Sequence, residues 1–366
     1  MNKALLHQIA LTLIPNIGCV YAKLLLQHLN VEEVFTAKKS TLLKIEGLGE
    51  IRANSIVRFD GFETAEKEME FIEKYKITPL FITDERYPKR LLNCYDSPTL
   101  LYYRGNADLN ASKIIAIVGS RTHTEYGKNL IRELLQPLAA SGILIVSGLA
   151  YGIDSLAHKA ALKNNLQTVG VLAHGLDKIY PAENTAMAKE MVQYGGLLTE
   201  FMTKTKPDRH NFPSRNRIVA GMSDATIVVE TDIKGGSMIT AELANGYNKD
   251  VFACPGKVSD KRSSGCNHLI KNNKAILLTD AQQLLETMGW EEKKKPLKKK
   301  VKELFIELST EERIIFDILK NTEVLSIDDI NLQSGLSSSS VAVAILNLEM
   351  QNIVQSLPGK MYKILD

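Results

Sequence analysis

The sequence predicts an α/β protein built on a Rossmann-like, doubly wound and mainly parallel sheet. Two observations support this fold. Short apolar segments rich in β-branched residues alternate with segments of helical periodicity over residues 113–290, which is the pattern of a sheet covered by helices on both faces. In addition, nearly every predicted strand ends in Gly, Ser, Asn or Arg, as expected where the carboxyl ends of parallel strands form a ligand-binding crevice.

The composition is that of an ordinary globular protein and argues against several other classes. The chain has 366 residues, of which 45% are hydrophobic and 24% charged, and its formal net charge is +3. Two or three domains are therefore expected, and any surface for a polyanion has to arise from local clustering. Because no signal-peptide pattern or membrane-spanning run is present, we expect a cytoplasmic protein without membrane contact. The four cysteines lack CxxC spacing, which predicts reduced thiols and no zinc site.

Residues 1–64 predict a small helical domain. Apolar helical segments flank two turns that contain glycine, one at Gly18 and one at Gly47-Leu48-Gly49. Such units are typical of helix-hairpin-helix or SAM-like domains, in which turn amides approach DNA phosphate. The alternative is that the glycines are helix C-caps in a small bundle. This alternative is favoured because only Lys23 and Arg52 supply positive charge near the turns.

Residues 65–290 predict one extended Rossmann-like domain. The prolines before residue 113 force extended or turn geometry, and we expect this first part to pack on the edge of the main sheet. Between the fourth and fifth strands of the sheet, Phe212 to Arg217 are predicted to form a loop that leads into a helix. The strands of the main sheet are predicted at residues 114–118, 143–146, 168–172, 197–200, 225–230, 251–254 and 275–278.

The ends of these strands predict a phosphate-binding edge. Backbone amides of glycine turns beside helix N-termini form anion sites. Arg121, Arg215 and Arg217 add guanidinium groups that bind phosphate through two hydrogen bonds. A single turn of this kind is explained by chain geometry alone, but several at one edge favour a binding role. The residues of this edge are Gly119, Ser120, Arg121, Gly148, Gly175, Gly236, Ser237, Gly256 and Asn267.

Signatures of nucleotide-dependent enzymes are missing from this edge. Gly119-Ser120-Arg121 does not match the Gly-x-Gly-x-x-Gly pattern of dinucleotide binding, and no Walker-type loop is present. Candidates for acid–base chemistry show no pairing of a nucleophile with a base. We therefore predict no catalytic residue, no cofactor and no metal. These candidates are Asp154, His158, His174, Glu200 and Glu230.

A nucleotide-processing enzyme of the phosphoribohydrolase type is the alternative. Such enzymes carry a Pro-Gly-Gly-x-Gly-Thr-x-x-Glu loop, which Gly235 to Glu242 partly matches. The leading proline is absent, however, and the spacing from threonine to glutamate is one residue short.

Eight short motifs are distributed over the central domain. They are GSRTHTEYG (119–127), SGLAYGIDSLAH (147–158), AHGLDKIYP (173–181), LLTE (197–200), FPSRNRIVAG (212–221), GGSMITA (235–241), CPG (254–256) and GCN (265–267). Together they resemble the motifs of the DprA/Smf family of DNA-processing proteins, and they occur in the order of the family. The resemblance extends from about Tyr87 to Leu278. One departure is Gly235, where the family usually has serine.

The resemblance implies a nonenzymatic protein of natural transformation that binds and protects single-stranded DNA and loads the RecA recombinase, with a homodimer formed through the Rossmann-like domain. By this resemblance, Arg121 and Arg209 contact phosphate and Phe212 stacks on or pockets a base. Packing before Pro213 explains Phe212 equally well. Single-strand binders generally combine cationic grooves with aromatic platforms. Further cations expected along the edge are Lys178, Arg215, Arg217, Lys234 and Lys257.

The C-terminal part predicts a tether followed by a winged-helix-like domain. Residues 291–302 are rich in lysine, which is typical of a flexible linker. Residues 303–366 predict three helices and a hairpin, an arrangement that many DprA-like chains also carry. The expected recognition helix, residues 337–351, has no lysine or arginine. Because a helix that reads a major groove needs basic side chains, we expect protein contact or a vestigial role.

Overall fold

The computed structural model describes residues 2–139, 141–291, 308–322, 324–357 and 360–365. These residues form two compact units, the first ending at Glu291 and the second containing the described residues from Leu308 onward. The linker predicted at residues 291–302 lies outside the described residues, apart from Glu291. No helix within the described ranges is long and apolar enough to cross a membrane.

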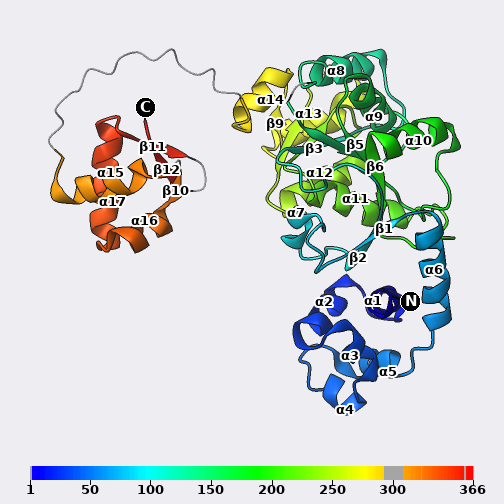
Figure 1. Cartoon of the computed structure of the whole chain (residues 1–366). Helices are drawn as coiled ribbons and strands as arrows, with labels where there is room; N and C mark the ends of the chain where they lie inside the picture. The colour runs from blue at the N-terminus through cyan, green and yellow to red at the C-terminus, as the bar shows by residue number, and fades with distance from the viewer. Residues whose placement is uncertain (1, 140, 292–307, 323, 358–359, 366) are drawn as a thin grey trace. The chain divides into compact units, whose positions relative to one another are not determined.

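The N-terminal part of the first unit is a small bundle of helices (Figure 1). A short helix that the sequence patterns missed begins with a capping box, in which Asn30 and Glu33 each accept a hydrogen bond from the backbone N–H of the other. The core of the bundle includes Phe81, Leu100 and Tyr102 of the first two strands, so the bundle and the sheet share apolar packing. The helices are α1 (Lys3–Leu13), α2 (Cys19–His28), α3 (Val31–Thr36), α4 (Lys39–Leu42), α5 (Gly49–Val57) and α6 (Phe62–Lys74).

A nine-stranded sheet forms the centre of the first unit. Neighbouring strands are parallel except at one edge, where two strands from the predicted edge segment pair antiparallel with each other and with the sheet. The doubly wound, mainly parallel sheet is therefore confirmed. In spatial order the strands are β1 (Thr78–Phe81), β2 (Leu100–Gly105), β6 (Gly195–Thr199), β5 (Thr168–Val171), β4 (Leu144–Ser147), β3 (Ile114–Val118), β7 (Ala225–Val228), β8 (Asp250–Ala253) and β9 (Ile276–Leu277).

Helices cover both faces of this sheet. In β3, Ile115 and Ile117 pack in one apolar core, while Ile114 and Val118 pack in a second core on the opposite face. Both faces are buried, which explains the uninterrupted apolar run in the sequence. The first core includes residues of α8 (Glu125–Leu135), α9 (Ile153–Lys163) and α14 (Ala281–Thr287), and the second includes residues of α7 (Lys89–Leu92), α11 (Asn211–Gly221), α12 (Gly236–Gly246) and α13 (Ser264–Lys271).

The winding of the chain reverses at β3. From β3 the chain adds β4, β5 and β6 on one side, and it then returns through α11 to place β7 on the other side of β3. On the way it forms the short 3-10 helix η1 (Ala182–Asn184) and α10 (Thr185–Gln193), which lies beside β6 in Figure 1. The connections after β3 and β7 run in opposite directions along the sheet. The place where the winding reverses in this way is a topological switch point, and it opens a crevice at the carboxyl ends of the strands.

The segment from Phe212 to Arg217 is helical, and the prediction of a loop there was wrong. It belongs to α11, which begins at Asn211. Pro213 fits because it lies in the first helical turn, where a backbone N–H has no partner inside the helix. Residues three and four apart share a helix face, so Phe212 lies on the same face as Arg215 and Asn216.

The second unit has the three helices and hairpin predicted for a winged helix. Its helices begin after Ser309, Ser326 and Ser337, and each of these side chains accepts a hydrogen bond from the N–H three residues later. The unit has its own apolar core. Its elements are α15 (Thr310–Lys320), β10 (Leu325–Ser326), α16 (Ile327–Ser334), α17 (Ser338–Met350), β11 (Val354–Leu357) and β12 (Met361–Ile364), with β12 antiparallel to both other strands.

Candidate nucleic-acid interface

A groove with a volume of about 570 Å³ lies at the carboxyl edge of the parallel strands. Its walls come from the turns after β3, β4 and β7 and from the first turns of α11 and α12. The tertiary structure thus brings together most of the site residues that the sequence predicted. Those that line the groove are Gly119, Ser120, Arg121, Gly148, Arg209, Phe212, Arg215, Gly236 and Ser237.

Arg121 and Phe212 form a direct contact at the rim of this groove. The guanidinium carbon of Arg121 lies 4.8 Å from the centroid of the Phe212 ring, a distance at which a cation is attracted to an aromatic face. In the part of the chain that the structure describes, the exposed Arg121 side chain has no carboxylate partner. Its outer N–H groups are therefore available to an anion.

Tyr180 supplies a second aromatic ring that the sequence patterns did not assign to the site. Its centroid lies 6.4 Å from that of Phe212, and 43% of the residue is exposed. It stands at the end of the motif 173–181, directly before Pro181. An aromatic residue within a motif that follows a predicted strand was the sequence signal that could have identified it.

Arg209 adds a second exposed cation to the groove. Among the described residues its side chain makes one polar contact, to the ring of the neighbouring His210 at 3.2 Å. Two acids also line the groove, but neither neutralises the rim. Asp232 lies 3.4 Å from Lys261, and Asp154 is buried.

Asp154 holds the turn after β4 in place through hydrogen bonds to its backbone. Its carboxylate accepts hydrogen bonds from the backbone N–H groups of Gly148 and Ala150 at 3.2 and 3.4 Å. Burial raises the pKa of Asp154, and the nearby positive charge of Arg215 opposes this rise. The acid therefore stabilises the backbone of the groove.

Arg215 lies beneath the groove and is only 4% exposed. Its guanidinium donates hydrogen bonds to the carbonyl oxygens of Gly148 and Val171. Burial lowers the pKa of Arg215 to about 10, so the group remains charged at neutral pH. A Cβ atom at Gly148 would lie 2.3 Å from this guanidinium, so a residue with a side chain does not fit at this position. The structure therefore places Arg215 in the floor, whereas the sequence suggested an exposed position along the edge.

Four other predicted cations do not line the groove. Arg217 faces away from it on α11, where it pairs with Glu200 and donates to the carbonyl oxygen of Asp96. Lys178 lines a separate hollow beside α10. Lys234 and Lys257 are exposed outside the groove. Lys178, Lys234 and Lys257 follow strands in the sequence, whereas Arg217 lies within α11. None of these four side chains lines the groove.

The turns after β3 and β4 are locked together by their backbones. The N–H of Ile153 donates to the carbonyl oxygen of Ser120 at 3.1 Å. Gly152 has a φ of 76°, and a Cβ atom there would lie 2.2 Å from the same oxygen. A side chain at this position would therefore be strained and would force the two turns apart.

The serines and glycines of the groove differ in their roles. Ser237 is buried and donates to the hydroxyl of Thr231 at 2.7 Å, and Ser120 bonds within its own turn to Thr122. Gly236 is exposed at the start of α12, and a Cβ atom there would have no neighbour within 4 Å. The N-terminal amides of α12 attract anions, so this turn is open to a phosphate.

The acid–base candidates are held in structural contacts. His158 is buried against a threonine hydroxyl at 2.7 Å, and burial lowers its pKa to about 3. His174 lies 2.9 Å from a backbone carbonyl. Glu230 accepts hydrogen bonds from the backbone N–H and the hydroxyl of Thr124, the N-cap residue of α8, and Glu200 pairs with Arg217. Within the described ranges, no group of His, Cys, Asp and Glu is placed to hold a metal ion.

The acid of the partial phosphoribohydrolase loop does not lie in the groove. Glu242 is on α12 and pairs with Lys274 at 2.8 Å. The groove is lined by the earlier part of the loop, from Gly235 to Thr240. The glutamate that such an enzyme would need therefore lies outside the groove that the glycine turn lines.

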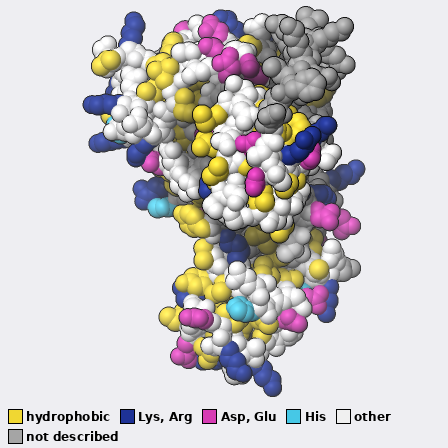
Figure 2. Space-filling model, turned by 90° about the vertical axis from the view of Figure 1, so that its left-hand side faces the viewer, with side chains coloured by type: hydrophobic (Ala, Val, Ile, Leu, Met, Phe, Trp, Pro, Cys, Tyr) yellow, Lys and Arg dark blue, Asp and Glu magenta, His cyan; other side chains and the backbone are white. Residues whose placement is uncertain are grey.

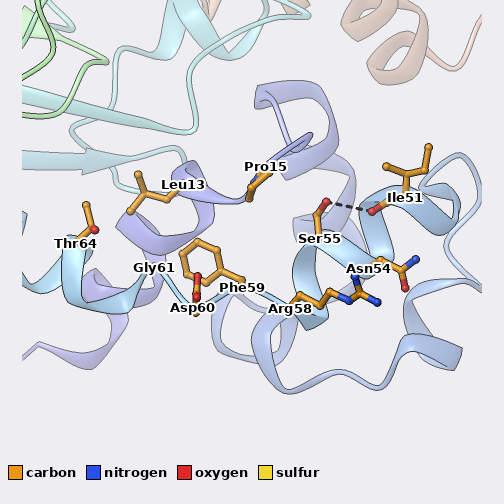
Figure 3. Close-up of a pocket in the computed structure, with 10 residues that line it drawn as sticks. All are labelled: Leu13, Pro15, Ile51, Asn54, Ser55, Arg58, Phe59, Asp60, Gly61 and Thr64. Carbon is orange, nitrogen blue, oxygen red and sulfur yellow. Dashed lines mark hydrogen bonds between the residues drawn. The ribbon is translucent and has the colours of Figure 1, made fainter.

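The helical bundle carries a smaller hollow of about 390 Å³ (Figure 3). Its wall includes one cation, Arg58, and one acid, Asp60, so it lacks the net positive charge of the groove. Ser55 donates to the carbonyl oxygen of Ile51 within this wall, as Figure 3 shows. The residues that line it are Leu13, Pro15, Ile51, Asn54, Ser55, Arg58, Phe59, Asp60, Gly61 and Thr64.

The two basic residues near the glycine turns of the bundle are engaged inside the protein. Lys23 donates to the carbonyl oxygens of Cys94 and Tyr95, and the guanidinium carbon of Arg52 lies 3.6 Å from the centroid of Tyr21. These contacts favour the structural interpretation of the turns. On the face shown in Figure 2, Lys and Arg side chains lie in small groups, with acidic and uncharged side chains between them.

Two family models match this chain. The model described as DNA recombination-mediator protein A matches residues 78–289, and the model described as DprA winged helix domain matches residues 306–360. Protein Smf of Synechocystis is 36% identical over 296 residues, which cover 79% of this chain and 73% of that protein. DNA processing protein DprA of Streptococcus pneumoniae is 40% identical over 213 residues, covering 58% of this chain and 75% of that protein.

Solved structures support the same relationship. The X-ray structure of DNA processing protein A from Streptococcus pneumoniae matches with a TM-score of 0.67 and 33% identity, covering 78% of this chain and 98% of that chain. A structure concerned with the single-stranded DNA binding mode of DNA processing protein A from Helicobacter pylori matches with a TM-score of 0.53 and 33% identity. It covers 58% of this chain and 95% of that chain.

Proposed function

The chain belongs to the DNA recombination-mediator protein A family, also named DprA/Smf, and we propose that its groove binds single-stranded DNA. In this proposal the protein protects incoming strands and loads the RecA recombinase in transformation and recombination. It acts without catalysis, as a homodimer formed through the Rossmann-like domain. The single-stranded DNA binding mode of the Helicobacter pylori relative supports the choice of ligand.

The observation that carries the proposal is the convergence of Arg121, Arg209 and Phe212 in one groove. A single strand presents a negative charge at each phosphate and an exposed aromatic face at each base. Unpaired cations bind the first, and an aromatic side chain stacks on the second. A duplex hides its base faces in the stack, so Phe212 favours single-stranded DNA.

Each residue of the groove has a distinct role in this proposal. Arg121 and Arg209 bind backbone phosphates, and the exposed turn at Gly236 receives a third. Phe212 and Tyr180 stack on bases, while Arg121 rests on the Phe212 ring and is already oriented before DNA arrives. Arg215 is a positioning residue, because it holds the carbonyl groups under the groove and does not reach its rim.

Fluorescence anisotropy with labelled single-stranded and duplex oligonucleotides tests the proposal. We expect the wild-type protein to prefer single strands. The Arg121→Ala/Arg209→Ala double variant should bind them more weakly, with a salt slope flattened by about 0.7 for each lost phosphate contact. Lys159→Ala, an exposed residue of α9 outside the groove, is the control.

Two outcomes would overturn the proposal. One is equal affinity for single-stranded and duplex DNA together with an unchanged affinity of the double variant. The other is release of free base from nucleoside monophosphates by the purified protein, which would establish the phosphoribohydrolase class instead.

A further inference from the structure

The loop between β5 and η1 separates the groove from a second hollow. Tyr180 lines the groove, whereas the preceding residues from Leu176 to Ile179 line a hollow of about 600 Å³ beside α10. Ile179 and Tyr180 are adjacent, and neighbouring Cα atoms are about 3.8 Å apart. Consecutive residues of this loop therefore line the two sites.

The second hollow combines an apolar floor with a cationic rim. Its rim receives Arg104 from the end of β2, Lys178 from the loop and Lys189 from α10. Among the described residues, Arg104 and Lys189 have no ion-pair partner, and the one lining acid, Asp177, lies 3.7 Å from Lys178. The floor consists of Leu176, Ile179, Ala188, Val192 and Leu197.

This lining matches the chemistry of a nucleotide. Three cations against one carboxylate leave an excess of positive charge, which attracts a phosphate. An apolar floor accepts the flat face of a base, and the side chains of Thr185 and Gln193 offer hydrogen-bonding groups at the wall. The volume falls in the range of about 300–1,000 Å³ that is usual for small-ligand sites.

We propose that the hollow beside α10 is a second nucleotide subsite for the same DNA strand. Arg104, Lys178 and Lys189 would bind phosphate there, and the apolar floor would receive a base after the strand has crossed the loop at Ile179 and Tyr180. This assignment rests on the proposed function of the groove and extends its binding path. It also gives a role to Lys178, which lies outside the groove although the sequence grouped it with that edge.

Oligothymidines of increasing length test this path in the full-length protein. Arg104→Ala/Lys189→Ala removes the two unpaired cations of the second hollow and none of the groove. We expect this variant to bind the shortest oligonucleotide that fills the groove as the wild-type protein does, and to lose affinity for longer ones. For long oligonucleotides the salt slope should fall by about 0.7 per lost contact.

The control is Lys159→Ala/Lys163→Ala, which removes two exposed cations of α9 that line neither site. It should match the wild-type protein at every length. Both double variants remove only exposed side chains, and their thermal unfolding is measured to verify that the fold is intact.

The outcomes separate this inference from the function on which it rests. If Arg121→Ala weakens binding at every length while Arg104→Ala/Lys189→Ala changes none, the second subsite is wrong and the groove stands. If neither variant changes binding, the proposed function itself fails. Thymidine monophosphate that binds the hollow without competition from a long oligonucleotide would show a site for free nucleotide and overturn the shared path.

Discussion

The groove of the first unit and helix α17 of the second unit differ sharply in their surfaces, although both belong to folds used for nucleic-acid binding. Among the described residues, the guanidinium groups of Arg121 and Arg209 have no carboxylate partner, and they lie in the groove with the half-buried ring of Phe212 and the exposed ring of Tyr180. Helix α17 lies where a winged helix would read DNA and has no lysine or arginine. Fold alone therefore does not distinguish these two surfaces as candidates for DNA binding; the position of charge does.

The exposed face of α17 has a different chemistry. Val343, Leu346 and Met350 are spaced by three and four residues, so they lie on one side of the helix, and all three are exposed. An exposed apolar stripe is typical of protein contact. A polyanion gains most of its affinity from cations that replace its counterions, and this stripe provides none. The expectation that the winged helix serves protein contact or has a vestigial role therefore stays a prediction.

The largest effect on stability is expected from a substitution in the floor of the groove, not at its rim. Arg215→Leu removes a buried charge and leaves the carbonyl groups of Gly148 and Val171 without a donor. We expect the free energy of unfolding to fall by about 3 kcal/mol or more, as measured by urea denaturation. The exposed-residue control Lys159→Ala should stay within about 0.5 kcal/mol of wild type. Unchanged stability of Arg215→Leu would show that Arg215 does not organise the floor.

Substitutions of Phe212 test whether its aromatic ring contributes to the difference between the groove and α17. Phe212→Ala should weaken single-strand binding by about 1–3 kcal/mol because a stacking platform is lost, whereas Phe212→Tyr should retain most of the affinity. Anisotropy titrations of both variants, with thermal unfolding to check their folds, give the measurement. Equal affinity of Phe212→Ala and wild type would assign Phe212 to helix packing before Pro213.

Salt dependence distinguishes cations of the groove from other surface cations. Arg209→Ala should flatten the dependence of single-strand affinity on salt by about 0.7 in log–log slope. Lys234→Ala removes an exposed cation that does not line the groove and should leave the slope unchanged. Equal slopes for the two variants would remove the distinction between the groove and the rest of the edge.

The smallest effect is expected on α17. Val343→Ser and Leu346→Ser change exposed side chains, so stability should move by no more than about 0.5 kcal/mol. Affinity for single-stranded and duplex DNA should stay the same in anisotropy titrations. A loss of duplex affinity in either variant would break the comparison and show that α17 contacts DNA through apolar side chains.

Sequence patterns were sufficient to predict the layered α/β fold, the winged helix and the edge of the sheet at which the groove lies. These features follow from local patterns: buried strands, helical periodicity and glycine turns at strand ends. These patterns are enough to locate the groove because parallel strands present their carboxyl ends at one edge of the sheet. Arg121, Arg209 and Phe212 were also grouped correctly in space, through the resemblance of their motifs to a known family.

The tertiary structure alone decided which arginines of α11 reach the groove floor. The sequence pattern predicted a loop from Phe212 to Arg217, and the first helical turn accommodates Pro213 instead. Once the segment is helical, residues two apart face different directions. Arg215 therefore lies under Gly148, and Arg217 pairs with Glu200 away from the groove. Two arginines two residues apart differ in their surroundings because helix geometry and long-range packing set the direction of a side chain.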